Sequence, residues 1–154
     1  KMSAPGGRTI PTGEIPVGPW DGGAGSLRVI AGSVGGAKGP AKTFTPIELY
    51  DLRLRAGHST PLQTPNGYNV GVLVLTGQAS VGGSHRLSEA ELAVFVSTGE
   101  PVTIVAEEDA TILVMAGEGI DEPVARYGPF VMNTKAELVQ AVSDYQAGKM
   151  GHLS

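Results

Sequence analysis

Short apolar runs separated by glycine and proline residues fill the middle of the chain. The longest run, residues 68–76 (YNVGVLVLT), is almost continuously apolar, as is typical of a strand that is buried on both faces or lines a barrel. Residues 47–55 alternate between apolar and polar positions, and one slip near Tyr50 and Asp51 predicts a bulged, half-buried strand. Shorter strands are predicted at residues 27–31, 79–81, 92–97, 102–105 and 111–116. This succession of short strands and turns favours an all-β barrel or sandwich.

The pattern changes to a helical one near the C-terminus. Thr134 followed three residues later by Glu137 forms a capping box, a signal for the start of a helix. Apolar residues then recur at helical spacing, at Leu138, Val142 and Tyr145. Gly148 offers the left-handed conformation that ends many helices. One amphipathic helix is therefore predicted over residues 134–148.

The predicted elements divide the chain into three parts. Residues 1–25 are rich in glycine and proline, so we expect an extended arm or linker that is able to add a strand to a neighbouring sheet. Residues 26–133 hold the barrel strands, and the helix at 134–148 is expected to pack on the barrel or on a partner domain. Lys1 precedes Met2, which indicates a start inside a longer gene product; a vector scar or a processed terminus would look the same.

Composition narrows the classes of function. The chain has no cysteine, which excludes disulfides and thiolate chemistry, and its formal net charge is −4. Lysine and arginine are scattered, so no broad basic surface is available for phosphates and direct nucleic-acid binding is not expected. We see no signal peptide and no apolar span long enough for a bilayer, and we expect a cytoplasmic protein without a membrane partner.

The C-terminal segment 127–151, YGPFVMNTKAELVQAVSDYQAGKMG, resembles the signature that ends proteins of the pirin family. Pirins are similar to two cupin barrels fused in one chain. The resemblance implies an all-β, cupin-like β-barrel or jelly roll with one C-terminal α-helix. It also implies Fe(II) in the family's N-terminal half, on three histidines and a glutamate, together with a link to quercetin 2,3-dioxygenase activity and transcriptional coregulation.

The cupin metal motifs can be placed on this chain, but their ligands are absent. Gly57 and Gly77 match the two glycines of the first motif. Its ligand positions then fall on Gln63, Pro65 and Val70. Gly82 places the histidine of the second motif on Ala93, or on a neighbour if the placement shifts by one residue. Because Fe, Mn, Ni and Zn need imidazole or carboxylate donors, no metal site, cofactor or catalytic residue is expected in this chain.

The histidines do not replace the missing ligands. His58, His85 and His152 all lie in predicted loops or in the tail, where surface positions explain them most simply. A metal site built from His58 and His85 would still lack a third ligand.

One polar cluster has two interpretations. Residues that would line a pocket for a small neutral ligand at the barrel mouth are Thr60, Gln63, Thr64, Tyr68 and Asn69. Alternatively, Pro61, Pro65 and Asn66-Gly67 form two tight turns, and their polar neighbours are simply solvated.

Two hypotheses about function follow. In the first, the chain is the metal-free C-terminal half of a pirin-like bicupin, a structural and regulatory partner of the N-terminal Fe-binding cupin domain of the same protein. This chain alone would then show no dioxygenase turnover. In the second, it is a stand-alone metal-free cupin that binds a small organic ligand or acts as a homodimer.

Overall fold

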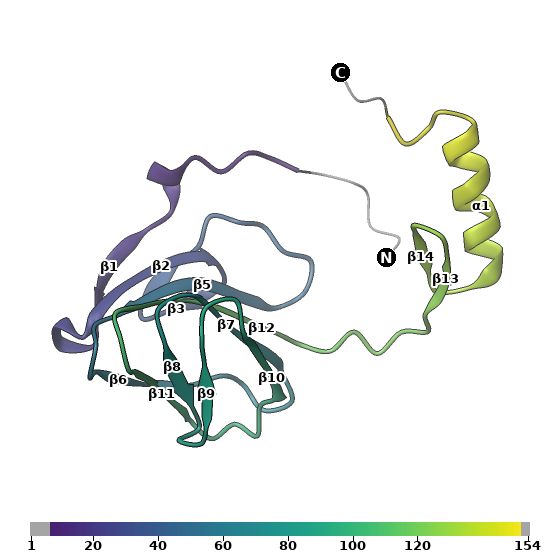
Figure 1. The fold of residues 1–154 in the computed structure, drawn as a ribbon. Helices are drawn as coiled ribbons and strands as arrows, with labels where there is room; N and C mark the ends of the chain where they lie inside the picture. Colours follow the sequence, from purple (N-terminus) through teal and green to yellow (C-terminus); the bar gives the residue numbers. More distant parts are fainter. Residues whose placement is uncertain (1–6, 152–154) are drawn as a thin grey trace. The chain divides into compact units, whose positions relative to one another are not determined.

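The computed structural model describes residues 7–151 and divides the chain into two compact units (Figure 1). The larger unit, Thr9–Gly119, holds the two main sheets. The second unit contains residues 120–151, which form a β-hairpin and the helix. The hairpin, which the sequence analysis grouped with the barrel, therefore groups with the helix.

The larger unit is a jelly roll of two antiparallel sheets. The six-stranded sheet has the order β1-β2-β5-β12-β7-β10 and the four-stranded sheet the order β6-β11-β8-β9. Their strands are β1 (Val17–Trp20), β2 (Gly25–Ala31), β5 (Ile47–Leu54), β6 (Ser59–Leu62), β7 (Asn69–Thr76), β8 (Ala79–Val81), β9 (His85–Leu87), β10 (Leu92–Val96), β11 (Val102–Ala106) and β12 (Ala110–Gly117). Two short 3-10 turns, η1 (Thr12–Glu14) and η2 (Asp21–Gly23), and the small hairpin of β3 (Ser33–Val34) and β4 (Ala37–Lys38) complete the unit.

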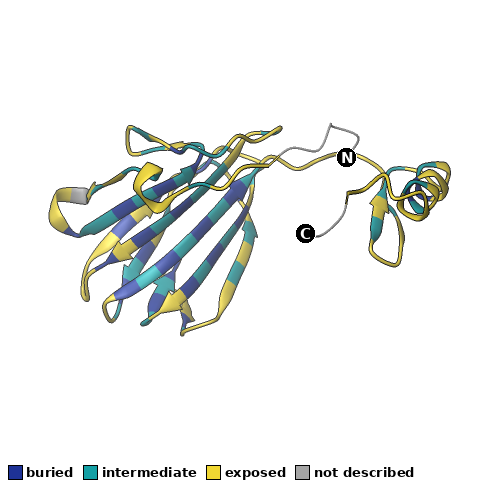
Figure 2. Ribbon diagram, turned by 90° about the horizontal axis from the view of Figure 1, so that it is seen from above, coloured by how far each residue is buried: buried dark blue, intermediate teal, exposed yellow. Residues whose placement is uncertain are grey.

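The core lies between the two sheets. Every second side chain of the long strands points into it. Figure 2 shows buried and less buried positions alternating along the long strands. In β12, for example, Ile112 and Val114 are fully buried, whereas Leu113 and Met115 are only partly buried. Because successive side chains of a strand point to opposite faces, one face of each long strand builds the core. The predicted all-β jelly roll is thereby confirmed.

The slip in the alternation of β5 has a different cause from the predicted one. Tyr50, Leu52 and Leu54 are buried in the core, whereas Ile47 and Leu49 lie on the opposite face. β5 is therefore apolar on both faces over part of its length. The bulge lies on β2, where the pairing moves from Val29–Tyr50 to Ala31–Leu49. The prediction of a bulge in β5 itself is wrong.

The first strand belongs to the main sheet. β1 pairs antiparallel with β2 over its whole length, although the sequence analysis assigned residues 1–25 to an extended arm. Trp20 ends this strand and packs against the core, which gives the segment an apolar anchor. The part of the predicted arm at residues 1–6 lies outside the described residues.

The second unit consists of the hairpin β13 (Ala125–Tyr127) and β14 (Phe130–Met132), followed by α1 (Lys135–Gln146). The predicted capping box is present: Thr134 Oγ1 accepts a hydrogen bond from the Glu137 N–H at 3.2 Å, and Glu137 Oε2 accepts one from the Thr134 N–H at 2.8 Å. Gly148 has a φ of +70°, the left-handed conformation predicted for the helix end. No helix within residues 7–151 has the length and apolarity that a membrane crossing requires.

Candidate functional site

The residues predicted to line a pocket do not all face the same way. Strand β6 alternates, so that Thr60 and the nearby Thr64 are buried while Gln63 between them is exposed. Tyr68 is half-buried, and Asn69 at the start of β7 is exposed. The structure thus brings Thr60 and Thr64 to the interior and leaves Gln63 and Asn69 outside. The sequence analysis did not predict β6, and left open whether these residues line a pocket or form two tight turns.

The polar groups of this cluster bond within the chain. The Trp20 Nε1–H donates a hydrogen bond to Thr60 Oγ1 at 2.8 Å, and the Gln63 amide donates one to the carbonyl of Gly99 at 2.6 Å. The N–H of Tyr68 donates to the carbonyl of Pro65 at 3.3 Å and closes a turn in which Gly67 has a φ of +83°. The tight turn at residues 65–68 is therefore present, as the second interpretation proposed.

The bond between Trp20 and Thr60 connects strands that lie in different sheets, so its loss should be measurable. We expect Thr60→Val, which removes the acceptor but keeps the shape, to lower the free energy of unfolding by about 1–3 kcal/mol, because the indole N–H loses its partner. Urea denaturation followed by far-UV circular dichroism measures this change, since that signal persists when Trp20, the chain's single tryptophan, is replaced. Adding Trp20→Phe should make the Thr60→Val substitution nearly neutral; equal costs in both backgrounds would contradict the bond's contribution.

The positions that match the cupin metal ligands do not fit a metal ion. Gln63 and Pro65 are exposed beside β6, whereas Val70 is buried on β7 and Ala93 on β10 packs against the core. None of these side chains carries the imidazole or carboxylate groups that hold iron. Within residues 7–151, no group of three or more His, Cys, Asp and Glu residues is placed to hold a metal ion.

The remaining histidines are separate from one another in the fold. His58 lies in the turn before β6, with its ring Nδ1 at 3.2 Å from the carbonyl oxygen of Ala56. His85 is exposed at the start of β9. His152 lies outside the described residues.

The sequence analysis overlooked two titratable groups on β5. Burial raises the pKa of the Tyr50 phenol well above its usual range, and the negative charge of Glu48 adds to this shift. Burial also raises the pKa of the Glu48 carboxyl. Both side chains share the face of β5 that carries Leu52, and reading the strand with an uninterrupted period of two would have placed them there.

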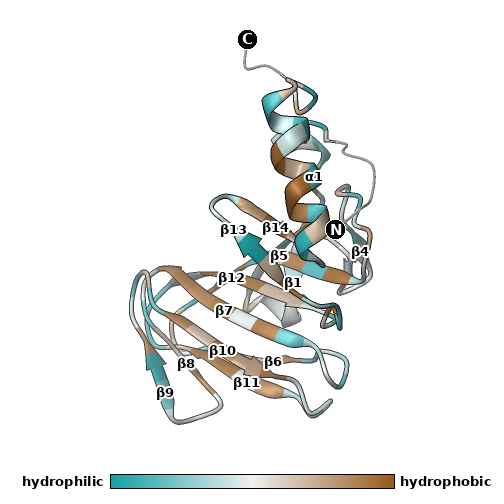
Figure 3. Cartoon of the chain, turned by 90° about the vertical axis from the view of Figure 1, so that its right-hand side faces the viewer, coloured by the Kyte–Doolittle hydropathy of each residue, from teal (hydrophilic) through white to brown (hydrophobic). Residues whose placement is uncertain are grey.

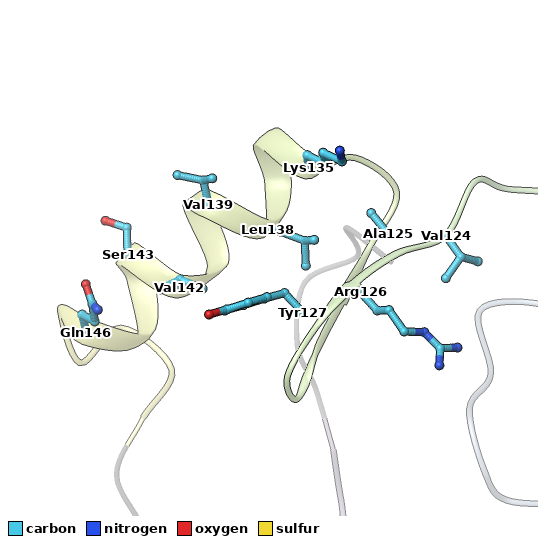
Figure 4. A pocket seen from close by; sticks show the side chains of 10 residues that line it. All are labelled: Val124, Ala125, Arg126, Tyr127, Lys135, Leu138, Val139, Val142, Ser143 and Gln146. Carbon is cyan, nitrogen blue, oxygen red and sulfur yellow. The ribbon is translucent and has the colours of Figure 1, made fainter.

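A groove of about 720 Å³ lies between the hairpin and α1 in the second unit. It is lined mainly by apolar side chains from both elements: Val124, Ala125, Arg126, Tyr127, Lys135, Leu138, Val139, Val142, Ser143 and Gln146. Figure 4 shows Leu138 and the ring of Tyr127 directed into the space between helix and hairpin. An apolar groove of this kind suits a protein segment better than a small charged substrate.

The helix buries only part of its apolar stripe inside this unit. Leu138 and Ala141 are buried and Val142 is half-buried. Tyr145 is 64% exposed, although its ring contacts Phe130 edge-on with 5.9 Å between the ring centroids. Val139 is also exposed, so apolar surface remains for a further contact.

The two-sheet jelly roll with a C-terminal helix defines a protein of the cupin class. Residues 49–151 match the family model described as the pirin C-terminal cupin domain, and the chain belongs to the pirin family. The predicted family is thus confirmed.

The relatives support the same assignment over nearly the whole chain. A pirin-like protein of Caulobacter vibrioides is 38% identical over 97% of this chain and 54% of its own length. A Pseudomonas aeruginosa protein named as a candidate quercetin 2,3-dioxygenase is 38% identical over 97% of this chain and 52% of its own length. The crystal structure of a quercetin 2,3-dioxygenase from Acinetobacter baumannii superposes with a TM-score of 0.83 at 39% identity, over 94% of this chain and 50% of that one. The chain therefore spans about half the length of the relatives it matches.

Proposed function

We propose that this chain is the metal-free C-terminal cupin half of a longer pirin-like protein, in which it serves as structural and regulatory partner of an N-terminal cupin half that carries Fe(II). The observation that carries the proposal is the set of side chains at the ligand positions. Gln63, Pro65 and Val70 stand where a metal-binding cupin needs two histidines and a glutamate. Dioxygenase chemistry on quercetin or a similar flavonol would then belong to the other half.

Two further observations support a partner domain. The family model that matches is that of a C-terminal domain, and the matched relatives are about twice as long as this chain. The second unit also keeps an apolar groove and an exposed Tyr145 available for contact. In this proposal the protein is cytoplasmic, and any role in transcription acts through other proteins, because the net charge of −4 does not favour direct contact with nucleic acid.

The test begins with the bases upstream of the codon for Lys1. We expect an open reading frame that continues upstream and encodes a His-x-His strand pattern. The longer product should bind about one Fe per chain and consume O₂ with quercetin, and deleting the part that corresponds to this chain should lower both its turnover and its melting temperature.

The opposite result would favour the second hypothesis. A gene that begins at Met2, with this chain behaving as a self-sufficient monomer or symmetric dimer, would indicate a stand-alone cupin. Thr60, Thr64 and Tyr68 would then be the first residues to probe for binding of a small organic ligand.

A further inference from the structure

An open seam separates the edges of the two sheets in the larger unit. Among the described strands, β9 ends the four-stranded sheet and pairs with β8 alone, while β10 ends the six-stranded sheet and pairs with β7 alone. Figure 3 shows the contrast between the two strands, with hydrophilic teal over most of β9 and hydrophobic brown along β10. Edge strands carry backbone N–H and C=O groups that no neighbouring strand satisfies. The seam therefore offers hydrogen-bond donors and acceptors beside apolar side chains.

A pocket of about 590 Å³ lies along this seam. Its inner wall consists of apolar side chains that belong to the core or pack against it: Val81, Leu87, Ala93, Phe95 and Val102. Small organic molecules bind in pockets of about 300–1,000 Å³ that are lined mainly by such side chains. Phe95 supplies an aromatic ring, which packs well against another ring. The size and the wall of this pocket thus suit a flat aromatic molecule.

His85 brings a polar ring to the edge of the pocket. The registers place His85 opposite Val81 of β8, and Val81 opposite Ile104 of β11. Residues that pair in a sheet point to the same side, and both Val81 and Ile104 are buried in the core. The imidazole of His85 therefore lies on the core-facing side of β9, yet it is exposed because β9 is the last strand of its sheet.

The charges around the pocket favour an uncharged ligand. Arg86 is the single Lys or Arg among the described residues that line the pocket, and its guanidinium donates a hydrogen bond to the carboxylate of Glu107. An imidazole ring in its neutral form can donate one hydrogen bond and accept another. The unpaired backbone groups of the seam also include both kinds. A hydroxyl group, which donates and accepts, matches these partners better than a carboxylate or a phosphate does.

We infer that the seam between β9 and β10 binds an uncharged aromatic molecule that carries hydroxyl groups, with its ring against Ala93 and Phe95 and a hydroxyl group at His85. This inference goes beyond the proposed function, because it assigns a binding site to the half that is proposed to hold no metal. A ligand in the seam contacts the edge strands of both sheets, so its binding stabilises the folded barrel. The site needs no residue of another domain.

The probe for this site is 2-naphthol, an aromatic molecule with one hydroxyl group that is uncharged near neutral pH. Naphthalene, which lacks the hydroxyl group, and 2-naphthoate, which has a carboxylate instead, are the matched comparison compounds. An NMR titration that follows each backbone amide of this chain locates the bound probe. We expect the chemical shift changes to concentrate at residues 81–87, 92–95 and 102. Both comparison compounds should bind about threefold to tenfold more weakly than 2-naphthol.

Two variants and a control test the assigned residues. His85→Ala should weaken the binding of 2-naphthol about threefold to tenfold, whereas His58→Ala, the same change in the turn before β6, should leave it unchanged. Ala93→Phe fills the pocket from β10 and should abolish the shift changes at the seam. Circular dichroism establishes whether each variant folds. If Ala93→Phe does not fold, the comparison of the two histidine variants decides.

Several results would overturn the inference. Shift changes confined to residues 124–146 would place 2-naphthol in the groove of the second unit, and no shift changes up to the solubility limit of the probe would mean that the seam is no binding site. Equal affinity of His85→Ala and the parent chain would remove His85 from the site. Binding of naphthalene or 2-naphthoate as tightly as 2-naphthol would contradict the ligand class. All of these outcomes leave the proposed function standing, because a metal-free partner half does not require a ligand.

Discussion

Purified chain that has been incubated with Fe(II) under anaerobic conditions is expected to retain far less than one equivalent after desalting. The physical reason is the donor set: an amide, a proline ring and a valine methyl at the first-motif positions, and a methyl at Ala93, cannot replace imidazole and carboxylate. Metal analysis by mass spectrometry measures the retained iron, and Ni(II) serves as a second probe that histidine binds readily.

Stoichiometric retention would contradict this prediction, and a control variant then locates the metal. His58→Gln combined with His85→Gln removes the two histidines of the described residues. If the double substitution abolished a bound equivalent, the iron would be held by these histidines, and the assignment of this half as metal-free would be wrong. The longer gene product is the positive control, since the proposed function requires it to hold iron.

Gly25→Ala is expected to lower the free energy of unfolding by about 3 kcal/mol or more, or to prevent folding. Gly25 begins β2 and lies between Trp20 of β1 and Leu54 of β5. A Cβ atom built on it would overlap the backbone carbonyl oxygen of Arg53 and lie within 2.8 Å of its carbonyl carbon. Backbone atoms cannot move aside as a flexible side chain does, so the two strands would have to separate.

Gly18→Ala is the matched control. Gly18 lies in β1 of the same sheet, and nothing is within 4 Å of a Cβ built on it. We expect its substitution to change the free energy of unfolding by no more than about 0.5 kcal/mol. Urea denaturation followed by Trp20 fluorescence compares both variants with the parent chain. Equal stability of the two variants would mean that β2 and β5 separate locally at little cost.

Local signals in the sequence located the helix and the long strands well. The start of α1 is marked by the capping box of Thr134 and Glu137, and its end by the glycine at 148. Both signals act through adjacent backbone groups. The apolar run at residues 68–76 became β7, and the strands predicted from position 79 onward lie within one residue of those observed. In each case the information lies within a few neighbouring residues.

The missed features depend on contacts between residues distant in sequence. β1 contains Gly18 and Pro19 among its four residues, which disfavour a strand. It is held in the sheet by pairing with β2 and by the hydrogen bond from Trp20 to Thr60, forty positions away. The short β6 reads as turns because Pro61 interrupts it, yet pairing with β11 makes it a strand. For the candidate site, the sequence shows which side chains occupy the cupin ligand positions, but not which of Gln63 and Thr64 faces inward. That choice depends on the register of β6.

The edge strand β10 has a consequence for how the protein is made. Its outward residues Leu92, Val94 and Val96 are all at least half exposed, and an apolar edge strand of this kind invites unintended strand pairing with other chains. If the chain is part of a longer protein, as proposed, synthesis as one polypeptide would supply both halves in equal number and at a high effective concentration. Splitting the gene would then be expected to reduce solubility even where it did not change catalysis.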